Sequence, residues 1–285
     1  MILRAVHTTT YRYSDAVSLC QTEVRLRPRN CRAQDVLEHE LVIDPAPRTS
    51  SMRSDYFGND VTAVTIDRIH EDLSIIATSL VDVRGTEAIH PGLTPSWEAV
   101  RDAISRHDIE DTFDAFQFAL ESPRVRLTPA FFDYSHPSFD TGRPILECAT
   151  DLCHRIYSDF KYDGAATNVN TAVEKTLRSR VGVCQDFAHV AIACFRSHGL
   201  AARYVSGYLR TGDDIIGANA SHAWLSVYCL GFGWIDIDPT NDAIPSTSHI
   251  TLAWGRDYSD VPPVKGVALG GGTHAVGVQV SVSPS

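Results

Sequence analysis

The sequence predicts an α+β fold, and three features of its pattern carry that prediction. Residues 1–95 consist of short β-branched or alternating runs separated by turn residues. Residues 186–198 are apolar on nearly every side, as expected of a helix in the middle of a domain. Three β runs follow, at Ala202–Leu209, Ser221–Cys229 and Trp234–Asp238. A central helix followed by antiparallel strands is typical of the α+β class.

The composition and the net charge of the chain indicate which kinds of partner it does not bind. The 285 residues include 25 Lys and Arg against 35 Asp and Glu, which gives a net charge of −10. An acidic surface argues against nucleic-acid binding and against adsorption to anionic membranes. The first residues do not follow the basic-then-apolar pattern of an export signal, and no apolar stretch approaches the roughly 18 residues that span a bilayer. We therefore expect no nucleic acid, no membrane, and a cytoplasmic location where the seven cysteines are reduced.

The first 95 residues are predicted to form a β-rich, β-sandwich-like domain. Clusters such as Asp44–Pro47 and Phe57–Asp60 have turn chemistry and separate the runs. Several short strands at this spacing suggest a sandwich or a partial barrel. The five predicted strands are Val6–Tyr13, Thr22–Arg27, Glu38–Ile43, Val61–Ile69 and Ser74–Val83.

The rest of the chain divides into a helical connector and a catalytic core. The connector, 96–142, begins where Ser96 can cap a helix. The core, 143–285, opens with a helix over Pro144–Tyr157, because apolar residues recur there at helical spacing. We assign the last β run, His274–Val282, to this core.

Cys184 is the candidate nucleophile. It follows a Gly-Val pair and opens the buried helix. A thiol at a helix N-terminus faces unpaired N–H groups and the positive end of the helix dipole, and both favour the thiolate. The backbone N–H of Cys184 could also stabilise an oxyanion. The alternative is a small buried apolar residue, which is the usual fate of a free cysteine and our expectation for Cys20, Cys31, Cys148, Cys153, Cys194 and Cys229.

His222 and Asp238 form a candidate base and orienting acid. If 230–232 is a three-residue hairpin loop, Cys229 lies opposite Gly233. Asp238 is then the diagonal neighbour of His222 on one face of the sheet, about 7–8 Å away between Cβ atoms and within reach of a side-chain hydrogen bond. The alternative is a solvent-facing histidine and an aspartate that caps a turn.

Together these three residues have the chemistry of a thiol–imidazole–carboxylate triad. The histidine takes the thiol proton, and the aspartate holds the ring tautomer. Such chemistry needs no metal and no organic cofactor, and we expect neither. His189 lies five residues beyond Cys184 on the same helix, so it is expected to point away and to belong to the core.

The surrounding motifs resemble those of bacterial transglutaminase-like proteins. Val181–His189, with Gly199–Tyr208 after it, is similar to the cysteine motif of their core. Ser221–Trp224 and Asp236–Thr240 are similar to the histidine and aspartate motifs. One branch of this family has an N-terminal β domain before this core and a closing segment after it. His7–Tyr13, Leu26–Arg29 and Asp55–Asn59 resemble parts of that domain, and Gly255–Pro263 resembles the closing segment.

The resemblance implies a papain-like transglutaminase core. In that core Cys184 is the nucleophile, His222 the base and Asp238 the orienting acid. Members of the family form a thioester acyl-enzyme at a carboxamide or peptide carbonyl, and an amine or water then takes the acyl group.

The resemblance leaves the second oxyanion donor open. Better-known transglutaminases often use a tryptophan upstream of the cysteine, and this chain has none between 143 and 184. Asn168 and Thr167 are candidates to replace it. Trp224 and Tyr208 are candidates to line the substrate cleft, although aromatic packing is the simpler interpretation.

These features predict a transglutaminase-like cysteine peptidase or amidase acting on a peptide or protein substrate. Hydrolysis is favoured over transfer because the upstream tryptophan and an obvious hydrophobic amine-docking segment are missing. One alternative is protein-glutamine gamma-glutamyltransferase activity, which cross-links proteins. The other is a non-catalytic peptide-binding protein that keeps the fold.

Overall fold

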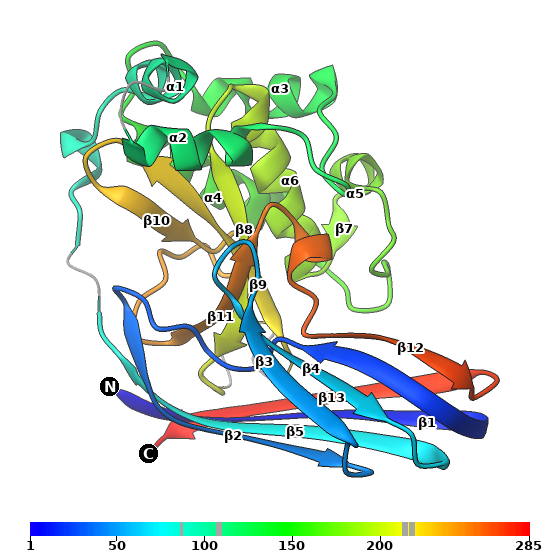
Figure 1. Ribbon diagram of the computed structural model, residues 1–285. Coiled ribbons are helices and arrows are strands. Elements are labelled where there is room, and N and C mark those ends of the chain that lie inside the picture. The colour runs from blue at the N-terminus through cyan, green and yellow to red at the C-terminus, as the bar shows by residue number, and fades with distance from the viewer. Residues whose placement is uncertain (86–87, 107–109, 213–215, 217–219) are drawn as a thin grey trace.

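Two β-sheets organise the molecule, as the computed structural model in Figure 1 shows. A seven-stranded sheet lies along the base of that view, and a four-stranded sheet stands above it among the helices. This arrangement confirms the predicted α+β class and the β-rich N-terminal domain. The described residues are 1–85, 88–106, 110–212, 216 and 220–285.

The large sheet is built around its first strand. Its members are β1 (Ile2–Val24), β2 (Gln34–Asp44), β3 (Thr49–Ser54), β4 (Asp60–Ile66), β5 (His70–Val83), β12 (Val264–Gly270) and β13 (His274–Pro284). The first half of β1 lies between β5 and β13, and its second half lies between β4 and β12. β2 extends the sheet beyond β5, and β3 extends it beyond β4. All these pairings are antiparallel.

The large sheet corrects two of the sequence predictions. The strand predicted at Val6–Tyr13 and the first three residues of the one predicted at Thr22–Arg27 belong to the single strand β1, whose pairing with β5 shifts register between Arg12 and Val17. The C-terminal run predicted at His274–Val282 does not join the catalytic core, because β13 pairs with β1 over eleven residues. Pairing across some 270 positions leaves no local trace in the sequence.

One face of the large sheet supplies an apolar interior. Leu3 and Ala5 of β1 are buried, as are Ile75 and Val81 of β5, and along both strands buried residues alternate with more exposed ones. This period of two places every second side chain on the inner face, toward the second sheet. Contact between the two sheets is made by His7, whose ring lies 5.6 Å from that of Tyr208.

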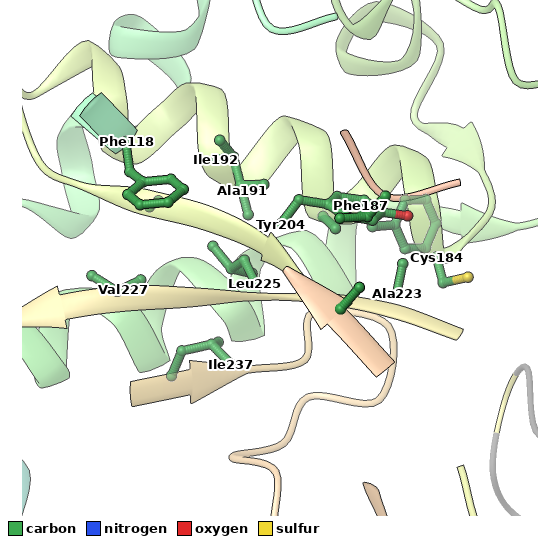
Figure 2. Packing of buried hydrophobic residues seen from close by; sticks show 14 of the residues in the cluster. Phe118, Cys184, Phe187, Ala191, Ile192, Tyr204, Ala223, Leu225, Val227 and Ile237 are labelled. Carbon is green, nitrogen blue, oxygen red and sulfur yellow. The ribbon is translucent and has the colours of Figure 1, made fainter. Parts of the chain in front are cut away.

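The four-stranded sheet has the order β10–β9–β8–β11 and is covered by the central helix. Its strands are β8 (Ala202–Leu209), β9 (His222–Cys229), β10 (Gly233–Ile237) and β11 (His249–Gly255), and the helix is α6 (Cys184–Ser197). Figure 2 shows Phe187, Ala191 and Ile192 of α6 facing Leu225 and Val227 of β9. Every residue of β8 and β9 is buried, so both faces of these strands are covered.

The remaining helices surround α6. They are α1 (Trp97–Arg106), α2 (Glu110–Phe116), α3 (Pro129–Ser135), α4 (Ile145–Asp159) and α5 (Val173–Ser179), with short 3₁₀ turns at Pro91–Leu93, Gln117–Ala119, His136–Ser138 and Tyr258–Asp260. The Ser96 hydroxyl accepts the N–H of Ala99 at 3.3 Å, which confirms the predicted cap of α1. Within the described part of the chain, no helix combines the length and the apolar character needed to cross a bilayer.

Two amide side chains join the large sheet to the outer edge of β11. Gln34 donates to the carbonyl of Thr251 and accepts its N–H, both at 2.8 Å. Asn59 donates to the carbonyl of Trp254 at 2.9 Å and accepts its N–H at 3.0 Å. An edge strand presents unpaired backbone groups, and here side chains from the other sheet pair with them. The position of β11 is therefore fixed from both sides.

Candidate active site

Cys184 is the first residue of α6. Figure 2 shows its sulfur projecting from that end of the helix, at the margin of the apolar layer. The Asp186 carboxylate accepts the N–H of Val183 at 2.9 Å and so caps the first turn. A Cβ on Gly182 would lie 2.7 Å from that carboxylate, which explains why glycine stands there. Cys184 as a whole residue is 8% exposed, so it is largely shielded from solvent.

The structure brings His222 and Asp238 together as the hairpin register predicts. Cys229 pairs with Gly233, so the loop has three residues. His222 Nε2 lies 2.8 Å from Asp238 Oδ2, and both side chains are buried. The other ring nitrogen, Nδ1, is buried and has no hydrogen-bond partner in the structure, while the ring lies close enough to Cys184 to respond to the charge there. One buried imidazole is therefore bonded to the carboxylate and lies within electrostatic range of the thiol.

Asp238 is held by more groups than the sequence suggests. Its Oδ1 accepts the N–H of Thr240 at 2.9 Å, and its Oδ2 accepts the side-chain amide of Asn241 at 2.8 Å. His249 Nε2 also lies 3.2 Å from Oδ2, while His249 Nδ1 lies 3.0 Å from the hydroxyl of Ser248. Sequence reasoning missed His249. Its signal was the alternation of His249, Thr251 and Ala253 with apolar neighbours, which is the pattern of a strand.

These contacts set the protonation states of the pair. Burial alone would lower the pKa of His222, but the charges of Asp238 and Cys184 outweigh it and raise the pKa to about 10. Burial alone would raise the pKa of Asp238, but His222 and His249 hold it well below its usual range. The favoured form is an imidazolium paired with a carboxylate.

His222, Asp238 and His249 also offer the atoms that a divalent metal would bind. Nε2, Oδ2 and Nε2 lie within 4.8 Å of one another, and imidazole with carboxylate is a ligand set used for zinc. Ligands about 2.0 Å from a tetrahedral ion lie about 3.3 Å apart. The observed 2.8 and 3.2 Å separations from Asp238 are those of hydrogen bonds, so an ion would require the side chains to move apart.

Trp224 and Tyr208 lie behind the site. Both are fully buried. The Trp224 ring stacks on His222, with centroids 6.0 Å apart, and meets His249 edge-on at 5.2 Å. A Cβ on Gly207 would come within 2.3 Å of the Trp224 ring, so glycine makes room for it. This burial argues against the predicted substrate contact and favours packing: Trp224 supports the imidazole from inside the fold.

Thr167 and Asn168, the two candidate hydrogen-bond donors to the oxyanion, form hydrogen bonds with nearby residues instead. The Thr167 hydroxyl donates to Asp186 Oδ2 at 2.6 Å. Asn168 is exposed, and its Oδ1 accepts the N–H of Asn170 at 2.9 Å within a turn. Tyr162 was overlooked: burial, and then the charge at Cys184, raises its pKa to about 12.

The other predicted core residues occupy buried or partly buried positions. His189 is buried, burial lowers its pKa to about 3, and its Nε2 accepts the N–H of Tyr258 at 3.2 Å. All seven cysteines are free thiols in the structure. Cys31 is the most accessible of them, because the others are buried.

Comparisons with known proteins agree with this fold. Residues 3–82 match the bacterial transglutaminase-like N-terminal region, and residues 137–239 match the transglutaminase-like superfamily. The second range includes Cys184, His222 and Asp238. The fold is that of papain-like thiol enzymes. The chain belongs to the bacterial transglutaminase-like proteins.

Relatives extend over nearly the whole chain. An uncharacterized protein of Mycobacterium tuberculosis is 41% identical over 292 residues, which cover 98% of this chain and 91% of that protein. One from Mycobacterium leprae is 30% identical, covering 99% and 98%. The solved structure of a proposed cysteine protease from Cytophaga hutchinsonii superposes with a TM-score of 0.77 at 20% identity, covering 99% of this chain and 90% of that one.

Proposed function

We propose that this protein is a thiol-dependent hydrolase that cleaves a peptide or carboxamide bond through Cys184, His222 and Asp238. The observation that carries the proposal is the placement of one buried imidazole. Its Nε2 lies 2.8 Å from Asp238, and the same ring lies within electrostatic range of the thiol that opens α6. A nucleophile, a base and a group that orients the base are the parts that covalent acyl transfer needs.

The acylation step follows from the protonation states of these groups. An imidazolium beside Cys184 stabilises the thiolate, which is the attacking form. The sulfur bonds to the carbonyl carbon, and the carbonyl oxygen becomes an oxyanion near the N–H groups that open α6. His222 then donates its Nδ1 proton to the leaving nitrogen as the carbon–nitrogen bond breaks. The products of this step are a thioester and a free amine or ammonia.

Deacylation reverses the role of the histidine. Neutral His222 takes a proton from water at Nδ1 while the water oxygen bonds to the thioester carbon. The carbon–sulfur bond breaks, which releases a carboxylic acid and regenerates the thiolate–imidazolium pair. Asp238 does not exchange protons: it holds the Nε2–H of the ring throughout. A primary amine in place of water would give an isopeptide by the same route.

Selective alkylation tests the nucleophile. The full chain is treated with limiting iodoacetamide at pH 7, and each cysteine is quantified by peptide mass spectrometry. Accessibility alone predicts that Cys31 reacts first, since Cys184 is only 8% exposed. The proposal predicts that Cys184 reacts at least about tenfold faster than Cys31, because a stabilised thiolate is the reactive species.

A matched variant and a turnover assay complete the test. In His222→Ala the preference for Cys184 should disappear while the rate at Cys31 stays unchanged. If Cys31 is labelled first in the wild type, the nucleophile assignment is wrong. A glutamine-containing peptide library, with and without a primary amine, then separates the reactions by mass: ammonia loss, isopeptides or shortened peptides.

A further inference from the structure

The turn that follows β10, residues 238–243, encloses the orienting carboxylate. Its backbone closes on Asp238, because the N–H groups of Asn241 and Ala243 donate to the Asp238 carbonyl at 3.3 and 3.2 Å. The Thr240 N–H reaches Asp238 Oδ1 at 2.9 Å, and the side-chain amide of Asn241 reaches Oδ2 at 2.8 Å. Asn241 is half-buried. The proton transfers of the proposed reaction do not involve its amide.

The Asn241 amide also holds a second segment of the chain. Its Oδ1 accepts the N–H of Ile216 at 3.1 Å, and its Nδ2 donates to the Ile216 carbonyl at 3.4 Å. Ile216 stands six positions before His222, in the stretch that leads into β9. One side chain is therefore bonded both to the carboxylate and to the backbone that precedes the base.

These bonds permit one orientation of the amide. Nδ2 carries two hydrogens and faces two acceptors, Asp238 Oδ2 and the Ile216 carbonyl, while Oδ1 faces a donor. A flipped amide would place Oδ1 against Asp238 Oδ2, so that two acceptors met at 2.8 Å. It would also turn the NH₂ group toward the Ile216 N–H. A side chain with a single satisfied orientation is suited to fix the orientation of the carboxylate that it contacts.

The turn that carries Asn241 is fastened to α4. The Cys153 thiol donates to the Asp238 carbonyl at 3.3 Å. His154 Nδ1 lies 2.7 Å from Asp242 Oδ2 on the exposed side of the turn. Asp242 has a φ of 49°, a left-handed conformation that aspartate adopts more readily than most residues. Because these contacts fix the turn, the amide holds Asp238 in place and does not simply follow it.

The amide differs from the other side-chain donors to Oδ2 because it carries no charge. His222 and His249 contact the same oxygen at 2.8 and 3.2 Å. In the proposed cycle His222 alternates between imidazolium and neutral imidazole, and the charged form gives the stronger hydrogen bond to a carboxylate. The bond from Asn241 does not change with that proton. It therefore keeps the carboxylate oriented in the stage in which His222 is neutral and takes a proton from water.

We propose that Asn241 is a positioning residue for this reaction: its amide sets the orientation of the Asp238 carboxylate and ties it to the segment that leads into His222. The inference rests on the proposed function, because the orientation of the base matters only if His222 exchanges protons with the substrate. Asn241 is not a catalytic residue, since it acts through Asp238.

The first test needs no substrate. The full-length protein is labelled with ¹⁵N in its histidines, and NMR follows the exchange of the His222 Nε2 proton with water, assigned by its loss in His222→Gln. In Asn241→Ala the carboxylate is less restrained, so this proton should exchange at least about tenfold faster than in the wild type. Asn30→Ala is the matched control and should leave the rate unchanged. Asn30 is an exposed asparagine that also forms a hydrogen bond, from the N–H of Val36 at 2.8 Å.

The second test measures turnover with the best library peptide. In Asn241→Ala a hydrogen bond to an ionised carboxylate is lost and no bond to the substrate, so kcat should fall about ten- to a hundredfold. KM should change less than about twofold, as expected for a residue that acts through another. Asn30→Ala should keep both constants.

Asn241→Asp separates positioning from a structural role through pH. The introduced carboxyl faces Asp238, and that like charge raises the pKa of the new group. Below this pKa its O–H donates to Asp238 in place of the amide, whereas above it two carboxylates repel each other and the donor is lost. The alkaline limb of kcat/KM should therefore lie at least about two pH units below the wild-type limb, which the His222 pKa of about 10 sets. The other ionisable groups around the turn are the same in both proteins: His154, His249 and Asp242.

Three results would overturn the assignment. They are an unchanged exchange rate of the His222 proton in Asn241→Ala, a kcat of that variant within about twofold of wild type, or an Asn241→Asp profile that is lowered uniformly and keeps its alkaline limb. Melting temperatures show that each variant is folded. If wild-type Cys184 is not alkylated selectively and no peptide is turned over, the hydrolase proposal fails. Faster ring exchange in Asn241→Ala would then still identify its amide as the group that orients the His222–Asp238 pair.

Discussion

The two sheets fill their interiors by different means. The large sheet buries aliphatic side chains such as Leu3, Ile75 and Val81 on one face and leaves polar residues on the other. The four-stranded sheet is aliphatic toward α6 and mixes aromatic with polar side chains on its other face. Its opposite face buries His222 and Ser226, which lie within hydrogen-bond reach of carboxylates.

This difference predicts which substitutions the interior of each sheet tolerates. Aliphatic packing depends on volume, so it loses stability in proportion to the atoms removed. A buried polar network depends on each partner being present, because a lone donor or acceptor keeps its desolvation cost. Substitutions of nearly equal size should therefore be mild in the first interior and severe for chemistry in the second.

Removal of the nucleophile should have the largest effect on activity. Cys184→Ala deletes one sulfur at the start of α6, so turnover should fall to background while the melting temperature changes little. Steady-state assays with the best library peptide and thermal unfolding measure the two quantities. A large drop in melting temperature would instead give Cys184 a structural role.

Asp238→Asn should lower kcat by about 10⁴-fold, because an amide no longer selects the productive ring tautomer. The pH profile of kcat/KM should change as well. The imidazolium donates the proton in acylation, so activity falls as pH rises through the His222 pKa of about 10. In the variant this alkaline limb should move to lower pH, since the carboxylate that raises the pKa is gone.

The control for that variant lies two residues away in the sequence. Asp236→Asn changes a carboxylate that is bonded to Ser226 and not to His222. Its rate and its alkaline limb should stay close to wild type. If Asp236→Asn is the slower of the two, the orienting acid is misassigned.

His249→Gln should have an intermediate effect, a loss of about tenfold in kcat/KM. The variant removes one hydrogen bond to an ionised carboxylate, and such bonds contribute about 1.5–3 kcal/mol. His249 does not reach the thiol in the structure, so it acts by positioning Asp238. The readout specific to that role is a small downward shift of the alkaline limb, which a general loss of stability would not cause.

Ile75→Ala in the large sheet should have the smallest effect on chemistry. It removes a fully buried side chain from an aliphatic interior, which costs about 2–5 kcal/mol in the free energy of unfolding. Urea unfolding measures that cost, and kcat/KM below the transition should stay within about twofold of wild type. A matching loss of activity in the folded protein would mean that the sheet positions the site more tightly than its contacts indicate.

Local patterns predicted the part of the site that lies on a single hairpin. A loop of three residues fixes which positions face each other, and the alternation of a strand then puts His222 and Asp238 on one face. The position of Cys184 followed from a helix that has no polar side. In each case the determining residues are within about twenty positions of one another.

Contacts between distant segments were not predictable in this way. β12 and β13 complete a sheet that begins at Ile2, and β12 is almost wholly exposed, so it has no apolar alternation to reveal its partner. His249 reaches Asp238 only because β11 pairs with β8, which places it at the edge of the same sheet. The burial of Trp224 likewise depends on the missing side chain at Gly207, a neighbour on another strand.

The amides of Gln34 and Asn59 imitate a fifth strand. Each offers one donor and one acceptor to the same residue of β11, as a neighbouring backbone would. A carboxylate at either position would present two acceptors and repel the carbonyl it now serves. The strand that supplies His249 therefore depends, for its outermost bonds, on two side chains that precede the catalytic motifs by more than a hundred residues.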